Sequence, residues 1–164
     1  MTRATIEAGA YLHHIHLHSP VPDALARFYS DTMDMPVVER DGKVFVVRGP
    51  RRRVLISEGP AKKLGHCAFA CRDAEGLQRI RAQAEDQGLA PAPVEMQLLE
   101  PGAFSVFDPD GNRVVFGLAK RGDEEKGGLL GPIQHLTLAS KDIKAIEAFY
   151  AGKLGFALAD GEPM

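Results

Sequence analysis

The chain has 164 residues, 45% of them hydrophobic, and a formal net charge of -2. This composition is typical of a globular protein with a buried core, and the charge gives no reason to expect nucleic acid or an anionic membrane surface as a partner. No apolar run reaches the roughly 18 residues that cross a bilayer, and the N-terminus has no secretion signal. Cys67 and Cys71 would lie about 13 Å apart on one strand, too far for a disulfide, so we expect buried free thiols and a cytoplasmic protein.

The first predicted module is β-α-β-β-β. A strand over 11–18 alternates in polarity and places His14, His16 and His18 on one face. Prolines and Asp23 then favour the start of a helix, and Asp41-Gly42 is a hairpin signal. The predicted elements are the helix 24–33 and strands 37–40, 44–47 and 53–57.

The second predicted module repeats this pattern, beginning with a strand at His66. Its elements are the strand 65–71, the helix 73–87 ended by Gly88, and strands 94–98, 104–107 and 113–118. The turn 108–112 joins the last two strands. The final hairpins of the two modules align, so that Phe45 matches Phe104 and Val47 matches Val106.

A third module is predicted after an exposed, charged and glycine-rich linker over 121–131. His135 follows His14, and Phe149 follows Phe28, by the same interval (135 − 14 = 149 − 28 = 121). The predicted elements are a strand over 133–140, a helix over 141–150 and a short strand over 156–159. We therefore expect one domain over 1–120, with modules at about 11–58 and 64–119, and the first part of a second, incomplete domain over 132–164.

Such a partial sheet would leave unpaired strand edges. We therefore expect the chain to be part of a longer protein, with residues 133–164 pairing with other strands.

Several of these features have a purely structural interpretation. The Phe-Tyr pairs 28–29 and 149–150 are typical of packing between helix and sheet, and Arg51–Arg53 of a solvated turn. A lone strand histidine is more often structural than a metal ligand, but the repeat favours a ligand role for His135. His13, His16 and His18 could bind metal only adventitiously, since strand residues two apart lie about 7 Å apart.

The strand-initial His14, His66 and His135, the "FY…LGF" helix end over 149–156 and the "DPDGNR" turn over 108–113 resemble the vicinal-oxygen-chelate superfamily. This superfamily includes glyoxalase I, bleomycin- and fosfomycin-resistance proteins and the type I extradiol dioxygenases. The resemblance implies an α+β fold in which paired βαβββ modules form a half-barrel around one divalent metal. A carboxylate ligand commonly lies two places after the arginine of the turn, but here that place holds Val115, and Leu55 in the first module.

The layout is closest to the extradiol, catechol ring-cleaving dioxygenases, in which a degenerate N-terminal domain precedes a domain that binds Fe(II) through two histidines and a glutamate. The resemblance implies that His135 is the first of those histidines and that His14 and His66 are relics. It implies Fe(II) outside the N-terminal domain, an aromatic diol and dioxygen as partners, and a homo-oligomer. The alternatives are a metal-free ligand- or drug-sequestering resistance protein and a glyoxalase-like lyase or isomerase; the sequence beyond Met164 would discriminate among them.

Overall fold

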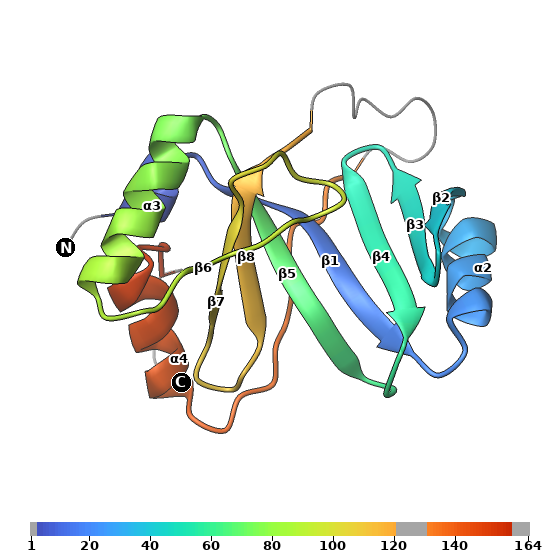
Figure 1. The fold of residues 1–164 in the computed structure, drawn as a ribbon. Helices are drawn as coiled ribbons and strands as arrows, with labels where there is room; N and C mark the ends of the chain where they lie inside the picture. The colour runs from blue at the N-terminus through green and yellow to red at the C-terminus, as the bar shows by residue number, and fades with distance from the viewer. Residues whose placement is uncertain (1–2, 121–130, 159–164) are drawn as a thin grey trace. The chain divides into compact units, whose positions relative to one another are not determined.

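The computed structural model describes residues 3–120 and 131–158 and shows an α+β fold (Figure 1). The helices are α1 (Ala4–Glu7), α2 (Pro22–Met33), α3 (Ala74–Asp86), α4 (Ile143–Glu147) and the π-helix η1 (Ala148–Lys153). The strands are β1 (Tyr11–Ser19), β2 (Val37–Asp41), β3 (Val44–Gly49), β4 (Arg52–Glu58), β5 (Lys63–Cys71), β6 (Ala92–Pro93), β7 (Phe104–Phe107) and β8 (Arg113–Leu118). No helix among the described residues has the length and apolar character needed to cross a membrane.

The chain forms two compact units, and strand β5 contributes to both. Among the described residues, unit A comprises Leu12–Ala68 and 131–137, and unit B comprises 3–11, Phe69–Lys120 and 138–158. The strand order is β2-β3-β4-β1-β5 in unit A and β5-β8-β7-β6 in unit B. In each module the first strand therefore lies beside the last, as two copies of one βαβββ pattern require.

The strand pairing confirms the predicted alignment of the two hairpins. In unit A the pairs are Phe45–Ile56 and Val47–Val54; in unit B they are Phe104–Phe116 and Val106–Val114. Strands β1 and β4 run parallel, with His16 opposite Leu55 and His18 opposite Ser57. Because side chains alternate along a strand, this register fixes which residues share a face.

One face of unit A forms its hydrophobic core. Ile15 and Leu17 of β1 pack against a buried cluster contributed by β3, β4, α2 and the segment after α2, which includes Ala26 and Met35. Helix α2 lies against β3 and β4 (Figure 1). The histidines at even positions of β1 therefore belong to the opposite face of the same sheet.

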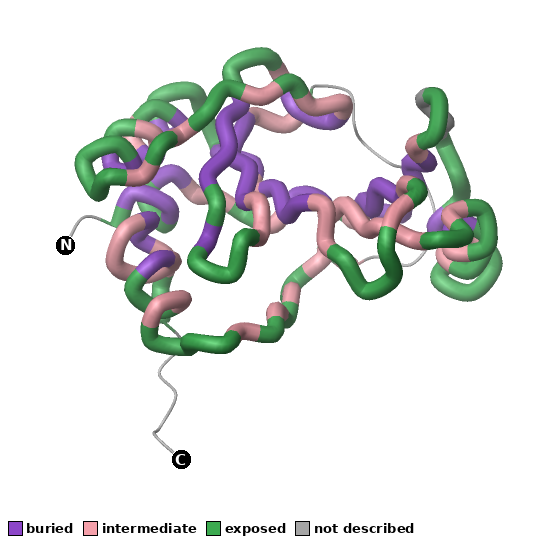
Figure 2. Tube along the Cα trace, turned by 60° about the horizontal axis from the view of Figure 1, so that its bottom comes forward, coloured by how far each residue is buried: buried purple, intermediate pink, exposed green. Residues whose placement is uncertain are grey.

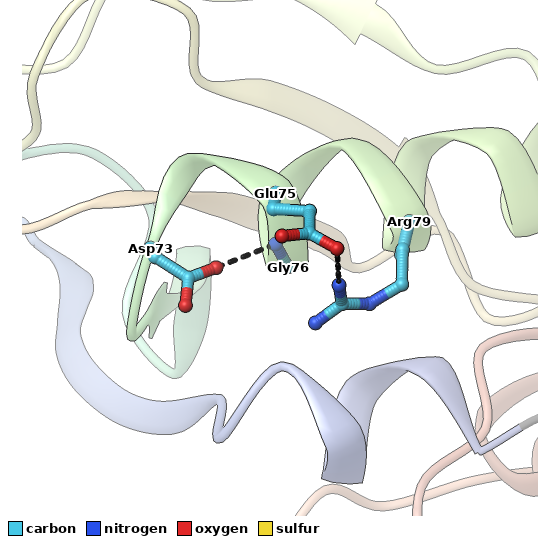
Figure 3. Close-up of polar contacts among 4 residues, drawn as sticks. All are labelled: Asp73, Glu75, Gly76 and Arg79. Carbon is cyan, nitrogen blue, oxygen red and sulfur yellow. Dashed lines mark hydrogen bonds and ion pairs between the residues drawn. The ribbon is translucent and has the colours of Figure 1, made fainter.

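The helix ends show the internal repeat most directly. Helix α3 begins at Asp73, whose carboxylate accepts a hydrogen bond from the Gly76 backbone N–H at 2.7 Å (Figure 3). It ends before Gly88, which has φ +72°, and left-handed residues also follow α2, at Asp34 (φ +50°), and η1, at Gly155 (φ +77°). Asp34 and Gly155 are counterparts in the repeat (155 − 34 = 121). The backbone therefore has the same left-handed conformation after α2 and after η1.

The third module differs from its prediction in the strands. Residues 133–140 have no regular secondary structure, and neither do 156–158; residue 159 lies outside the described part. Along 131–140 exposed and half-buried residues follow one another in a largely alternating order (Figure 2). The segment is therefore not the edge-paired strand we expected, because a strand forms only where a neighbouring strand supplies backbone hydrogen bonds. Residues 121–130, most of the predicted linker, lie outside the described part of the chain.

The helix of the third module forms as predicted, but it packs within unit B. The Phe156 ring contacts the Phe69 and Phe116 rings, with centroids 5.0 and 6.2 Å away. The Thr5 hydroxyl donates to the Leu154 carbonyl, and the Gln83 amide donates to the Lys153 carbonyl at 2.8 Å. Residues 138–158 thus complete the core of unit B.

Two further predictions were wrong in detail. The strand expected over 94–98 is replaced by β6, which pairs Ala92 and Pro93 with β7. Arg51–Arg53 is not a uniformly solvated turn, since only Arg51 lies in the turn and the Arg53 side chain, on β4, is buried. Cys67 and Cys71 are buried and form no disulfide, as predicted.

Candidate functional site

The second face of unit A carries the histidines that the sequence singled out. His14, His16 and His18 extend from β1, and His66 extends from the adjacent strand β5. Ser57 of β4 stands opposite His18 in the parallel register. The strand alternation that buries Ile15 and Leu17 in the core therefore gathers imidazoles on the other side of the sheet.

Three buried imidazoles are joined by two close nitrogen contacts. His13 Nδ1 lies 2.8 Å from His14 Nδ1, and His14 Nε2 lies 3.1 Å from His66 Nε2. Each contact needs a proton on one of its two nitrogens, so one neutral tautomer of His14 donates with one nitrogen and accepts with the other. Burial, and then the neighbouring His66, lowers the pKa of His14 well below its usual value. The ring is therefore neutral near pH 7.

A second pair of imidazoles holds a serine hydroxyl. Ser57 Oγ lies 2.8 Å from His16 Nε2 and 3.1 Å from His18 Nδ1, so it can donate to one ring and accept from the other. The His16 ring also stands edge-on to His66, with centroids 5.1 Å apart. Burial, followed by His18, lowers the pKa of His16 to about 4. The sequence pattern did not indicate that Ser57 would connect these rings.

The described residues around His14 and His66 do not fit a three-ligand metal site. Leu55, in the place of the superfamily's carboxylate, is a buried apolar side chain. The buried Arg53 adds a positive charge that lowers the His14 pKa further and opposes a bound cation. No cluster of three or more His, Cys, Asp or Glu within residues 3–120 and 131–158 is arranged to hold a metal ion. Sites for zinc or non-haem iron need at least three protein ligands.

The corresponding position in unit B is also apolar. Val115 of β8 is fully buried opposite Ser105 of β7. Arg113, the counterpart of Arg53, donates to the Ser105 hydroxyl at 3.2 Å. The described part of the second module thus offers no carboxylate at the place where the superfamily's ligand commonly lies.

His135 belongs to the third module. Its side chain is exposed, on the irregular segment 131–140. Its flanking Leu136 and Leu138 are half-buried, so the chain turns its apolar side chains inward and presents the imidazole to solvent. The ligand role of His135 stays a prediction.

Unit B contains a polar junction that the sequence interpretation missed. The buried Asp108 accepts hydrogen bonds from the backbone N–H groups of Asp110 and Asn112, at 3.0 and 2.7 Å, and from the Asn112 amide. The Tyr150 hydroxyl donates to Asp108 Oδ2 at 3.1 Å, and the Lys141 backbone N–H lies 3.5 Å from Asp110 Oδ1. The "DPDGNR" turn therefore holds the helix of the third module. The only sequence feature that could have indicated this contact is the presence of both the turn motif and Tyr150, the repeat counterpart of Tyr29.

The Phe-Tyr pairs were predicted to pack between helix and sheet. Phe149 is buried and Tyr29 packs against the core cluster, as predicted. Phe28 differs, because its ring is 51% exposed.

No protein-family model and no characterised protein sequence matches the chain. Its structure is similar to BphC, a halotolerant catechol dioxygenase, with a TM-score of 0.75 and 14% identity over 89% of this chain and 55% of that one. A catechol 2,3-dioxygenase gives 0.73 and 17% over 93% and 61%. The Mn(II)-bound glyoxalase from Novosphingobium aromaticivorans gives 0.72 and 19% over 89% and 52%.

The chain spans between 52% and 61% of the length of these three structures. The identities are low, so the likeness bears on the fold and not on the activity. Together with the repeated βαβββ modules, it shows that the chain has the fold of the vicinal-oxygen-chelate superfamily.

Proposed function

We propose that this chain is the N-terminal part of an extradiol ring-cleaving dioxygenase that acts on an aromatic diol and dioxygen. In this proposal the two modules of residues 1–120 are structural, and Fe(II) binds outside them. His135 supplies the first imidazole ligand, and the remaining ligands belong to chain beyond Met164. Fe(II), when bound, would supply open coordination positions for the diol and for dioxygen.

The observation that carries the proposal is the buried, apolar character of Leu55 and Val115. Each lies on the last strand of its module, where the superfamily commonly has a carboxylate ligand, and neither can bind a hard cation. The imidazoles of His14 and His66 are instead used in contacts with each other and with His13. A protein with this fold and a degenerate first domain needs its metal site elsewhere, and His135 is the third strand-initial histidine of the repeat.

The exposure of His135 also supports the proposal, since a ligand must be accessible to the ion and to the residues that complete the site. His14, by contrast, is fully buried. His14 and His135 therefore differ in their accessibility to a metal ion, although they hold equivalent positions in the repeat.

A second candidate function is ligand sequestration without a metal. The observation in its favour is the polar, partly buried face of unit A, where His16, His18 and Ser57 could offer hydrogen bonds to a bound molecule. The third candidate function is that of a glyoxalase-like isomerase or lyase. Such an enzyme would need a metal site in the second domain, as the dioxygenase does.

Oxygen uptake discriminates among these functions. The full-length protein, purified anaerobically and supplied with Fe(II), is expected to consume oxygen in the presence of catechols and to yield ring-opened products. Tight binding of an aromatic compound with neither bound metal nor oxygen uptake would replace the dioxygenase proposal with sequestration. Metal-dependent turnover of a hemithioacetal without oxygen would favour the glyoxalase-like alternative.

A further inference from the structure

Two copies of one helix bury different sets of side chains in this structure. Helix α2 belongs to the first module, and α4 with η1 is its copy in the third, 121 residues later. Helix α2 turns Ala26 into the core of unit A. The counterpart of Ala26 is Glu147 (147 − 26 = 121), which is exposed, whereas Phe149 is 4% exposed within unit B.

The face of α2 that corresponds to Phe149 is open. Phe28, the counterpart of Phe149, lies about 200° around the helix from Ala26, because successive helical residues are about 100° apart. Its ring therefore points away from the core of unit A. Val37 and Val38 of β2, the edge strand beside α2, are exposed as well. An exposed aromatic ring next to an apolar strand edge is typical of a surface that packs against another element.

We propose that this surface, formed by Phe28, Val37 and Val38, is the docking site for a fourth βαβββ module on the same polypeptide beyond Met164. The inference rests on the proposed function, in which the chain continues into a complete second domain. In the structure, the helix of module three packs within unit B, which contains module two. If a twofold axis relates the two homologous domains, the contact of the module-three helix with module two has a symmetric counterpart. In that counterpart the helix of module one packs against module four. Such reciprocal contacts are the rule for interfaces with twofold symmetry.

Two observations identify the occupant. The related structures are longer than this chain, which spans 52–61% of them, so their length accommodates a fourth module. A second copy of this chain cannot provide the equivalent contact, because the surface of its unit B that takes the Phe149 helix is already filled by its own residues 138–158.

The test measures the accessibility of position 28 in the full-length protein and in the 164-residue chain. Cys67 and Cys71 are buried, so a thiol introduced by Phe28→Cys is the one that reacts quickly with a maleimide. Phe107→Cys is the matched control, since Phe107 is 62% exposed on β7. We expect the thiol at position 28 to react several-fold more slowly in the full-length protein than in the 164-residue chain, and the thiol at 107 at equal rates in both.

Hydroxyl-radical footprinting of the unmodified protein covers the case in which Phe28→Cys itself weakens docking. Protection of the native Phe28 ring in the full-length protein supports the proposal. Equal labelling of Phe28 in both lengths, together with equal thiol rates, would overturn it. Protection in the 164-residue chain that grows with protein concentration would also overturn it, because a second copy would then be the occupant.

The proposal and the proposed function can fail separately. Iron content and catechol-dependent oxygen uptake are measured on the same full-length preparation. Protection of Phe28 without iron or oxygen uptake would retain the docking surface and reject the dioxygenase, and the opposite result would reject the docking surface alone.

Discussion

Replacing Leu154 with alanine tests whether the third module is part of the fold of unit B. The Leu154 side chain is fully buried, and its carbonyl accepts the Thr5 hydroxyl hydrogen bond. Truncating a buried leucine removes its packing and leaves a cavity, at a cost of about 2–5 kcal/mol. We expect about 3 kcal/mol here, because the site is completely enclosed. At about 2–4 °C for each kcal/mol in a chain of this size, the midpoint of thermal unfolding should fall by about 6–12 °C.

Urea denaturation of the 164-residue chain measures this change directly. The control is Leu158→Ala, since Leu158 is 58% exposed and its truncation should change the free energy of unfolding by less than about 0.5 kcal/mol. Equal, small effects of both substitutions would show that residues 138–158 are not packed within unit B in solution.

Three further predictions concern single contacts and charges. Burial lowers the pKa of His16 from 6.5 to about 4, so the unfolded chain binds the proton more tightly. The contribution of His16 to stability should therefore be complete above pH 6.5 and fall between pH 6.5 and 4. His16→Gln should reduce the slope of this dependence in urea titrations at each pH without abolishing it, because the lowered pKa of His14 acts in the same direction. Asp34→Gly should raise the free energy of unfolding by about 0.5–1 kcal/mol, and Gly155→Ala should lower it by a similar amount, because both positions are left-handed; a loss of stability in the first variant would contradict the reasoning. Tyr150→Phe removes the hydrogen bond to Asp108 and should cost about 1 kcal/mol by chemical denaturation; an unchanged midpoint would show that the contact is not made in solution.

The repeat was the most informative feature of the sequence. It aligns Asp34 with Gly155, and the structure gives both residues a left-handed conformation. It also predicted the hairpin register, because the alternation of apolar residues determines which side of a strand faces the core. The hairpin register depends on local sequence, so the sequence alone was enough to predict it.

The contacts between distant segments were not predictable in the same way. Residues 133–140 have the alternation of a strand, but a strand also needs a pairing neighbour, and pattern alone does not provide one. The buried Asp108 was interpreted only as part of a turn, although it also accepts the Tyr150 hydroxyl across 42 residues of sequence. The Ser57 hydroxyl likewise meets His16 and His18 only because β1 and β4 run parallel in one register.

The iron content of His135→Ala tests the central claim most directly. The full-length protein is purified anaerobically and reconstituted with Fe(II), with His18→Ala as the control from the histidine face of unit A. The account predicts roughly one iron per chain in the unmodified protein and in His18→Ala, and a loss of iron in a folded His135→Ala variant. Retention of iron by His135→Ala would contradict the assignment of His135 as a ligand, and loss of iron in His18→Ala alone would place the metal in the N-terminal domain.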